Sequence, residues 1–236
     1  MRGFFDFRCP KCEEKVSFPK RLMGTVQECP RCFQDMVVPE RPQEAARELR
    51  VDIRTKRLVF RRLNDKDRND LVEIMSDGES LRYLNWQTLD GEDVEEWLVR
   101  DASVRLMELG TYVYFGIEAP AISKLVALVS FIYQDEEFKE AGFNVVVNRT
   151  LRCHGYGTET VRGVLAFAFD EVNLHRVSVG CHNQNTAGLK MLDQAGMRRE
   201  GEFIENTKIR GEWVNTVFYA MLRREWHQNS ATNQLK

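Results

Sequence analysis

The sequence of 236 residues lacks several features that would define a class at once. No apolar run approaches the length of a membrane-spanning helix, and the first residues lack the apolar centre of a secretory signal peptide. The formal net charge is only −2, so no overall basic excess points to nucleic acid or to an anionic membrane. We therefore expect a cytoplasmic protein that is not held at a membrane.

Cysteine is scarce, with six in the chain, and four of the six form two matched Cys-Pro-Lys/Arg-Cys turns near the start. Two residues separate the cysteines within each pair and sixteen separate the pairs, which are Cys9, Cys12, Cys29 and Cys32. This spacing is typical of tetrahedral zinc, whereas two redox pairs would accompany a βαβ pattern that the sequence lacks here. A unit this small needs a metal to fold, so we predict structural Zn²⁺.

The cysteine unit resembles a zinc ribbon, although the glycine usual after each second cysteine is replaced by Glu13 and Phe33. We assign residues 1–41 to this zinc-ribbon-like module, 42–55 to a partly helical linker, 56–228 to the main domain and 229–236 to a disordered tail. The module is a candidate for contact with a partner protein. Nucleic acid is disfavoured because the module's charges nearly balance.

Hydrophobic periodicity predicts that the main domain mixes strands and helices. Strands are expected at 58–60, 112–117, 125–133, 143–147 and 175–181, and helices at 67–75, 94–107, 159–171 and before Gly196. This order predicts an α+β or α/β fold with helices on both faces of a central sheet.

The segment Arg152–Thr158, between a strand and a helix, contains two glycines. A glycine-rich turn that leads into a helix presents backbone N–H groups and the positive end of the helix dipole, which together favour a phosphate. The segment lacks the Gly-Lys-Ser/Thr of a Walker loop and the third glycine of the dinucleotide fingerprint. An ordinary strand-to-helix connection is the alternative interpretation.

The Arg-x-x-Gly-x-Gly pattern of this segment resembles the coenzyme-A loop of the GNAT N-acetyltransferases. A second segment resembles the next motif of that family: strand 175–181, then Asn185, a helix, Gly196-Met197 and Glu200-Gly201. Residues 211–226 resemble the final strand of the RimJ/RimL-type branch, which acetylates protein N-termini. The resemblance covers residues 57–226 and implies a GNAT-like mixed sheet with helices on both faces.

The resemblance implies an acetyl-CoA-dependent N-acetyltransferase in which a primary amine attacks the thioester directly. The acceptor would be a protein N-terminal α-amine or a small amine. The donor-binding residues it implies are Val145, Val147, Arg152, His154, Gly155, Tyr156, Gly157, Thr158 and Asn185, with the Val147 N–H as oxyanion donor. Solvated loop positions for His154 and Cys153, and a helix N-cap for Asn185, are the alternatives.

Two hydroxyl groups common in the family are missing. Leu192 stands where many GNAT enzymes carry a tyrosine acid, and Gly188 where the RimJ/RimL-type branch tends to carry a serine. A thiol of pKa about 8.5 leaves with little help, so water suffices as the acid. Glu118, Glu202 and Glu205 are candidate bases, although most carboxylates are simply exposed.

The missing hydroxyls also favour an alternative function, a non-catalytic CoA-binding module that docks a partner through the zinc ribbon. For an enzyme, the pKa of an α-amine, about 8 against about 10.4 for lysine, favours the α-amine as acceptor. The acceptor pocket is expected from residues 76–91 and 133–140, with Trp86 as a pocket wall and Trp97 in the core.

Overall fold

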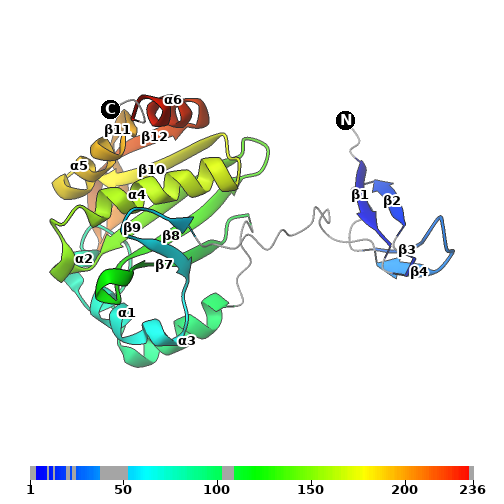
Figure 1. Cartoon of the computed structure of the whole chain (residues 1–236), viewed down its shortest axis with the longest axis horizontal. Helices are drawn as coiled ribbons and strands as arrows, with labels where there is room; N and C mark the ends of the chain where they lie inside the picture. The colour runs from blue at the N-terminus through cyan, green and yellow to red at the C-terminus, as the bar shows by residue number, and fades with distance from the viewer. Residues whose placement is uncertain are drawn as a thin grey trace. The chain divides into compact units, whose positions relative to one another are not determined.

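The computed structural model describes residues 4–9, 11–12, 14–19, 22, 25–37, 53–102 and 109–233. The chain divides into two compact units, Met1–Arg50 and Val51–Lys236 (Figure 1). The predicted linker up to residue 52 lies outside the described residues, while Ile53–Arg54 form a strand. Within the described residues, no helix combines the length and apolarity needed to cross a bilayer.

The first unit consists of two antiparallel hairpins. Strands β1 (Phe4–Arg8) and β2 (Lys15–Pro19) form one, and β3 (Val26–Glu28) and β4 (Asp35–Val37) form the other. Its small buried cluster contains Val16, Met36 and two of the cysteines. So few apolar side chains cannot stabilise an independent fold without a further cross-link.

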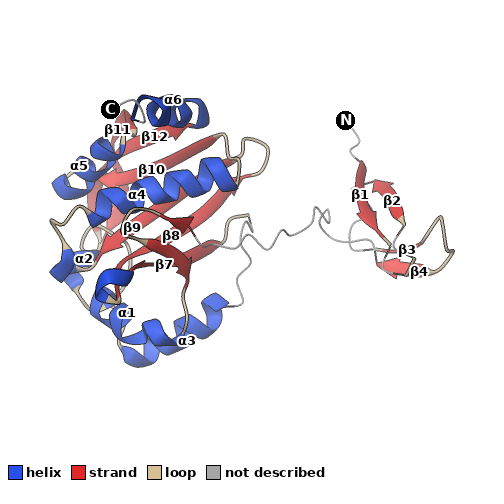
Figure 2. Cartoon of the chain, in the orientation of Figure 1, coloured by secondary structure: helices blue, strands red, loops and turns tan. Residues whose placement is uncertain are grey.

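The second unit is a mixed eight-stranded sheet in the order β11-β12-β10-β9-β8-β7-β6-β5, with helices around it (Figure 2). The strands are β5 (Ile53–Arg54), β6 (Val59–Arg62), β7 (Tyr112–Ala119), β8 (Lys124–Asp135), β9 (Glu140–Val147), β10 (Arg176–His182), β11 (Arg198–Ile209) and β12 (Glu212–Leu222). The helices are α1 (Arg68–Met75), α2 (Gly78–Leu81), α3 (Gly91–Ala102), α4 (Tyr156–Ala166), α5 (Thr186–Ala195) and α6 (Arg223–Asn233). Helix α6 therefore includes residues 229–233 of the predicted tail, and residues 234–236 lie outside the described part.

Two buried clusters show which helices cover which face. Val161, Val164 and Leu165 of α4 pack against the β9 residues Ala141 and Phe143. On the other face, helices α1 and α3 pack against alternate residues of the same strands, among them Leu128 and Val146. We call it the acceptor face because residues 76–91, from which the acceptor pocket is expected, lie between these two helices. Side chains of a strand alternate between faces, so neighbouring residues of β9 point to opposite sides of the sheet.

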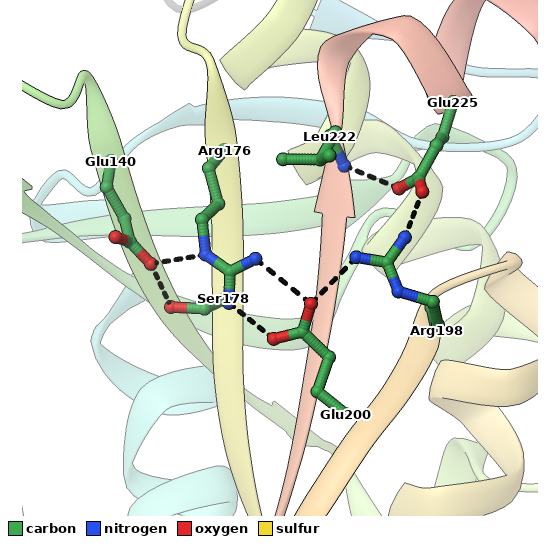
Figure 3. Close-up of polar contacts among 7 residues, drawn as sticks. All are labelled: Glu140, Arg176, Ser178, Arg198, Glu200, Leu222 and Glu225. Carbon is green, nitrogen blue, oxygen red and sulfur yellow. Dashed lines mark hydrogen bonds and ion pairs between the residues drawn. The ribbon is translucent and has the colours of Figure 1, made fainter.

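A group of ion pairs holds β9, β10 and β11 together at one end of the sheet (Figure 3). Arg176 of β10 contacts Glu140 of β9 at 2.9 Å and Glu200 of β11 at 2.6 Å. Glu200 also accepts from Arg198, which pairs in turn with Glu225 of α6. We call these five residues the strand clamp, because they link three strands and a helix where β9 and β10 begin to run side by side.

Candidate donor and acceptor sites

Strands β9 and β10 are the one parallel pair among the described strands, and they pair over just three rows, Glu140–Arg176 to Gly142–Ser178. Beyond these rows β9 stays paired with β8 as far as Val147, and β10 with β12 as far as His182. The sheet is therefore split by an opening between residues 143–147 and residues 179–182.

The opening reaches both faces of the sheet. Val145, Val147 and Val179 are half-buried on the α4 side although they lie in the middle of an eight-stranded sheet. On the acceptor face Asn144 and His182 are half-buried, and Gly180 is exposed. A ligand between the two strands would therefore reach both sides.

The edge of β9 that borders the opening has free hydrogen-bonding groups. The N–H of Asn148 donates to Val126 of β8 at 2.9 Å. Successive residues of a strand direct their backbone N–H groups alternately to the two neighbouring strands. Since Asn148 faces β8, the N–H groups of Val147 and Val145 face the opposite way, into the opening. These are two of the residues implied by the family resemblance.

The glycine-rich segment lies at the open end of the split and leads into α4. Gly155, the N-cap, has φ 79°, a left-handed conformation that glycine adopts without steric cost. The N–H groups of residues 153–158 have no hydrogen-bond acceptor among the described residues. Free N–H groups at a helix start favour an anion. Arg152 adds a cation, and its Nε lies 3.4 Å from the Val147 carbonyl oxygen.

Arg57 braces this segment, a role that the sequence did not reveal. Its Nη1 donates to the His154 carbonyl oxygen at 3.0 Å, and its guanidinium lies 4.6 Å from the centre of the Tyr156 ring. Its Nε contacts Glu159 of α4 at 2.7 Å. Burial opposes ionisation of Glu159, but hydrogen bonds from Thr55 and Arg57 outweigh it and keep the pKa of Glu159 below its ordinary value. No local pattern signals this pair, because the partners are 102 residues apart.

The remaining loop and cysteine side chains have modest roles. His154 is exposed and its Nδ1 donates to the Arg152 carbonyl oxygen at 2.7 Å. Cys153 is an exposed free thiol with φ 64°. Burial raises the pKa of Cys181 to about 11, which keeps that thiol protonated and a poor nucleophile.

The segment between α1 and α3, residues 76–91, from which we expect the acceptor pocket, borders the opening on the acceptor face of the sheet. Four contacts hold it there: Arg149 Nη1–Asp77 Oδ1 at 3.5 Å, Arg152 Nη2–Ser80 Oγ at 2.6 Å, Arg210 Nη2–Gly78 O at 3.3 Å and the Tyr83–His182 rings at 5.0 Å. Trp97 is buried as predicted, and Trp86 lies edge-on to Tyr114 at 6.1 Å. Residues 136–139, by contrast, connect β8 to the start of β9 at the opposite end of these strands.

The three candidate bases lie in different surroundings. Glu202 contacts Arg199 at 2.8 Å and accepts from the side-chain amides of Asn183 and Asn215 at 3.4 and 3.3 Å. Glu205 is exposed, and its carboxylate has no hydrogen bond or ion pair with a described residue. Glu118 pairs with Arg61 at 2.8 Å and lines a polar hollow of about 620 Å³ beside β6 and β8, away from the free edge of β9.

The two positions without the hydroxyl have different surroundings. Leu192 of α5 is buried in the core. At Gly188 a Cβ atom would lie 2.6 Å from Asn185 Nδ2 and 3.0 Å from Cys181 Sγ, so a serine would require these side chains to shift. Asn185 is the N-cap of α5, and its Oδ1 accepts from the Gly188 N–H at 3.0 Å.

The four paired cysteines meet in the first unit. Their Sγ atoms all lie within 4.8 Å of one another, and the Cys9–Cys32 and Cys12–Cys29 Sγ atoms are 3.9 Å apart. Tetrahedral zinc with Zn–S bonds of about 2.3 Å requires sulfurs about 3.8 Å apart, so the set fits zinc. The N–H groups of Lys11 and Arg31 each donate to a cysteine sulfur at 3.4 Å.

A sheet split at its parallel pair, with a glycine-rich helix start at the open end, defines the GNAT class of coenzyme-A-dependent acyltransferases. A family model described as an acetyltransferase (GNAT) domain matches residues 57–198. The chain belongs to this family, and acetyl-CoA is its cosubstrate. The predicted family, the mixed sheet and the N-acetyltransferase class are confirmed.

Similar proteins agree with this assignment. An uncharacterized N-acetyltransferase of Bacillus subtilis (strain 168), YnaD, is 27% identical over 189 residues, which are 74% of this chain and 99% of YnaD. A spermidine N-acetyltransferase from Vibrio cholerae, solved with CoA and spermine, superposes with a TM-score of 0.63 at 17% identity, covering 73% of this chain and 99% of its own. A ribosomal-protein-S5-alanine acetyltransferase from Vibrio fischeri gives 0.64 at 16% identity, covering 73% and 97%. At these identities the two structures establish the fold alone.

Proposed function

We propose that the chain transfers the acetyl group of acetyl-CoA to the α-amine of a peptide or protein N-terminus. The observation that carries this proposal is the opening between β9 and β10, which has free N–H groups on β9 and an acceptor face bordered by arginines. The donor enters from the α4 side and the amine from the acceptor face.

The donor would be held mainly by backbone groups. The N–H groups of residues 153–158 and the side chain of Arg152 bind the pyrophosphate, and Arg57 keeps the loop in place. His154, just before α4, and Tyr156, its first residue, have stacked rings 6.1 Å apart at the same end of the donor site. The N–H of Val145 binds the pantetheine arm, and Asn185 borders it from α5.

The reaction needs closeness, deprotonation and charge stabilisation. The amine nitrogen attacks the thioester carbonyl carbon, and the Val147 N–H stabilises the resulting oxyanion. The carbon–sulfur bond then breaks, the thiolate takes a proton from water, and the amine loses its proton to water or to a base. Glu202 is the best-placed base of the three, because it lies next to Asn183 at the end of β10.

Charge around the opening supports an α-amine over a polyamine. Arg149 on the rim is paired with Asp77, and Arg152 is assigned to the pyrophosphate. Arg210 has no carboxylate partner among the described residues, so its charge is left to repel a polycation. The nearby carboxylates of Asp77 and Glu202 are already paired with arginines. An α-amine of pKa about 8 is also partly neutral near pH 7.5, whereas an alkyl amine of pKa about 10.4 is almost fully charged.

An acceptor panel tests this proposal. CoA release is measured with short peptides that have free N-termini, the same peptides with blocked N-termini, spermidine and N-blocked lysine, and mass spectrometry locates the acetyl group. We expect turnover with free N-termini alone. Preference for spermidine, or acetylation of lysine side chains, would overturn the proposed acceptor. Glu202→Gln and Glu205→Gln, assayed with the best peptide, test the two bases, and unchanged kcat/KM in both would exclude both.

We also propose that the first unit holds one structural Zn²⁺ on Cys9, Cys12, Cys29 and Cys32, as the sulfur positions support. Four thiolates leave no coordination position for substrate, so the metal would be structural. Free cysteines in the described residues fit the cytoplasmic location predicted from the sequence. A partner protein for this unit stays a prediction, supported by the exposed Val26, Phe33 and Val37.

A further inference from the structure

Asn144 and His182 lie on opposite sides of the opening, both on the acceptor face. The side chain of Asn144 points to the same face of the sheet as that of Val146, which packs with α1 and α3. The side chain of His182 points to the same face as that of Ser178, the β10 residue that pairs with Gly142. The His182 ring lies 5.0 Å from the Tyr83 ring. Asn144 lies two residues beyond the last paired row, Gly142–Ser178, and His182 four residues beyond it, so the two side chains share one face of the sheet on opposite rims of the opening.

The Asn144 amide has a defined orientation. Its Nδ2 donates to Ser130 Oγ on β8 at 3.1 Å, and Ser130 is fully buried. The NH₂ group is thus turned away from the opening, and Oδ1, on the other side of the planar amide, has no donor among the described residues. A half-buried carbonyl oxygen is best satisfied by a hydrogen-bond donor, such as an amine.

His182 is a donor in its present setting. Its Nδ1 accepts the backbone N–H of Gln184 at 3.0 Å, so the proton of the neutral ring lies on Nε2. Burial lowers the pKa of His182, which favours this neutral form. With Nδ1 occupied and Nε2 already protonated, the ring cannot act as a base. Nε2–H has no acceptor among the described residues.

We propose that Asn144 and His182 are the positioning pair for the acceptor, which deepens the function proposed above and rests on it. Asn144 Oδ1 accepts a hydrogen bond from the attacking amine, and His182 Nε2–H donates to the carbonyl oxygen of the acceptor's first residue. An aminoacyl group carries a donor and an acceptor on adjacent carbons, so it satisfies both. A simple alkyl amine satisfies Asn144 and leaves the His182 N–H unpaired.

Two matched acceptors separate these roles. Isopropylamine has a methyl group in place of the carboxamide of alaninamide, which His182 would bind, and its amine also has a higher pKa. Each variant is therefore compared with the wild type on the same amine, so that the pKa difference cancels. His182→Phe keeps a ring beside Tyr83 and removes the donor, and we expect kcat/KM for alaninamide to fall about 10- to 100-fold while that for isopropylamine changes less than about twofold. Asn144→Ala should lower kcat/KM for both amines. His182→Gln, which restores an N–H donor, should recover part of the loss for alaninamide.

The controls distinguish a local effect from a general one. The KM for acetyl-CoA should stay unchanged in all three variants, which would show that the fold and donor site are intact. His227→Phe on the exposed part of α6 should behave as the wild type. Equal losses for both amines in His182→Phe, or no loss for alaninamide, would overturn the pairing. If the wild type already prefers isopropylamine, the proposed function fails instead.

Discussion

Removing the charge of Glu200 should weaken the strand clamp in a pH-dependent way. Arg176 and Arg198, both within 2.7 Å of its carboxylate, hold the pKa of Glu200 at about 2 instead of the ordinary 4.5. At about 1.36 kcal/mol for each pKa unit, this lowering corresponds to at most about 3.4 kcal/mol. Because 30% of the side chain is exposed, water screens the pairs, and we expect about 1–2 kcal/mol for Glu200→Gln at pH 7.

The sign of the pH dependence follows from the lowered pKa. A carboxyl group whose pKa is lower in the folded than in the unfolded chain stabilises the fold above pH 4.5 and loses this contribution as the pH falls towards 2. Glutamine has no charge to lose. The stability difference between wild type and Glu200→Gln should therefore be full at pH 7 and shrink steadily below pH 4.5.

Urea unfolding followed by tryptophan fluorescence measures this difference. All four tryptophans, Trp86, Trp97, Trp213 and Trp226, belong to the second unit, so the cysteine unit is silent in this assay. Glu212→Gln, which removes an exposed carboxylate with no ion pair in the described residues, serves as the matched control and should change stability by less than about 0.5 kcal/mol. A Glu200→Gln difference that is the same at pH 3 and pH 7 would refute the reasoning.

Further predictions concern the metal and donor sites. Metal analysis should find about one zinc per chain, and none after Cys29→Ser. Gly188→Ser should lower stability by about 1–3 kcal/mol in urea unfolding, and adding Cys181→Ala should recover part of it because the thiol is one of the two obstructing groups. Arg152→Ala should raise the KM for acetyl-CoA about 10-fold in steady-state assays, with peptide KM shifted less. Phe33 has φ 59°, a left-handed conformation that glycine adopts without steric cost. Phe33→Gly should therefore raise the urea midpoint of the cysteine unit, as measured by far-UV circular dichroism.

Short-range patterns anticipated several local features. A helix was expected from residue 159 and begins at Tyr156, and Asn185 is the N-cap of α5. The two cysteine pairs meet in one cluster, although the zinc they would hold stays a prediction. Each of these features depends mostly on residues close in sequence, where spacing is tied directly to geometry. The left-handed backbone at Phe33 also explains why ribbons prefer glycine there. Family resemblance then supplied the cosubstrate, which no spacing alone identifies.

The features that the sequence did not predict depend on contacts between residues far apart in the chain. The point at which β9 and β10 separate depends on twist and pairing between strands about 35 residues apart, which no local pattern records. Arg57, in the turn between β5 and β6, meets Glu159 of α4 across 102 residues of sequence. The short helix α2 is held by arginines from two other segments. Likewise, the orientation of Asn144 depends on Ser130, a buried neighbour on another strand.

The free edge of β9 has a consequence for how the family varies. A donor arm bound there takes the place of a missing strand neighbour, and its partners are main-chain groups that every amino acid except proline possesses. Side chains along residues 143–147 are then free to change with the core and the acceptor without loss of donor binding. Proline at residue 145 or 147 is the exception, because it alone removes an N–H group that the proposed donor binding uses.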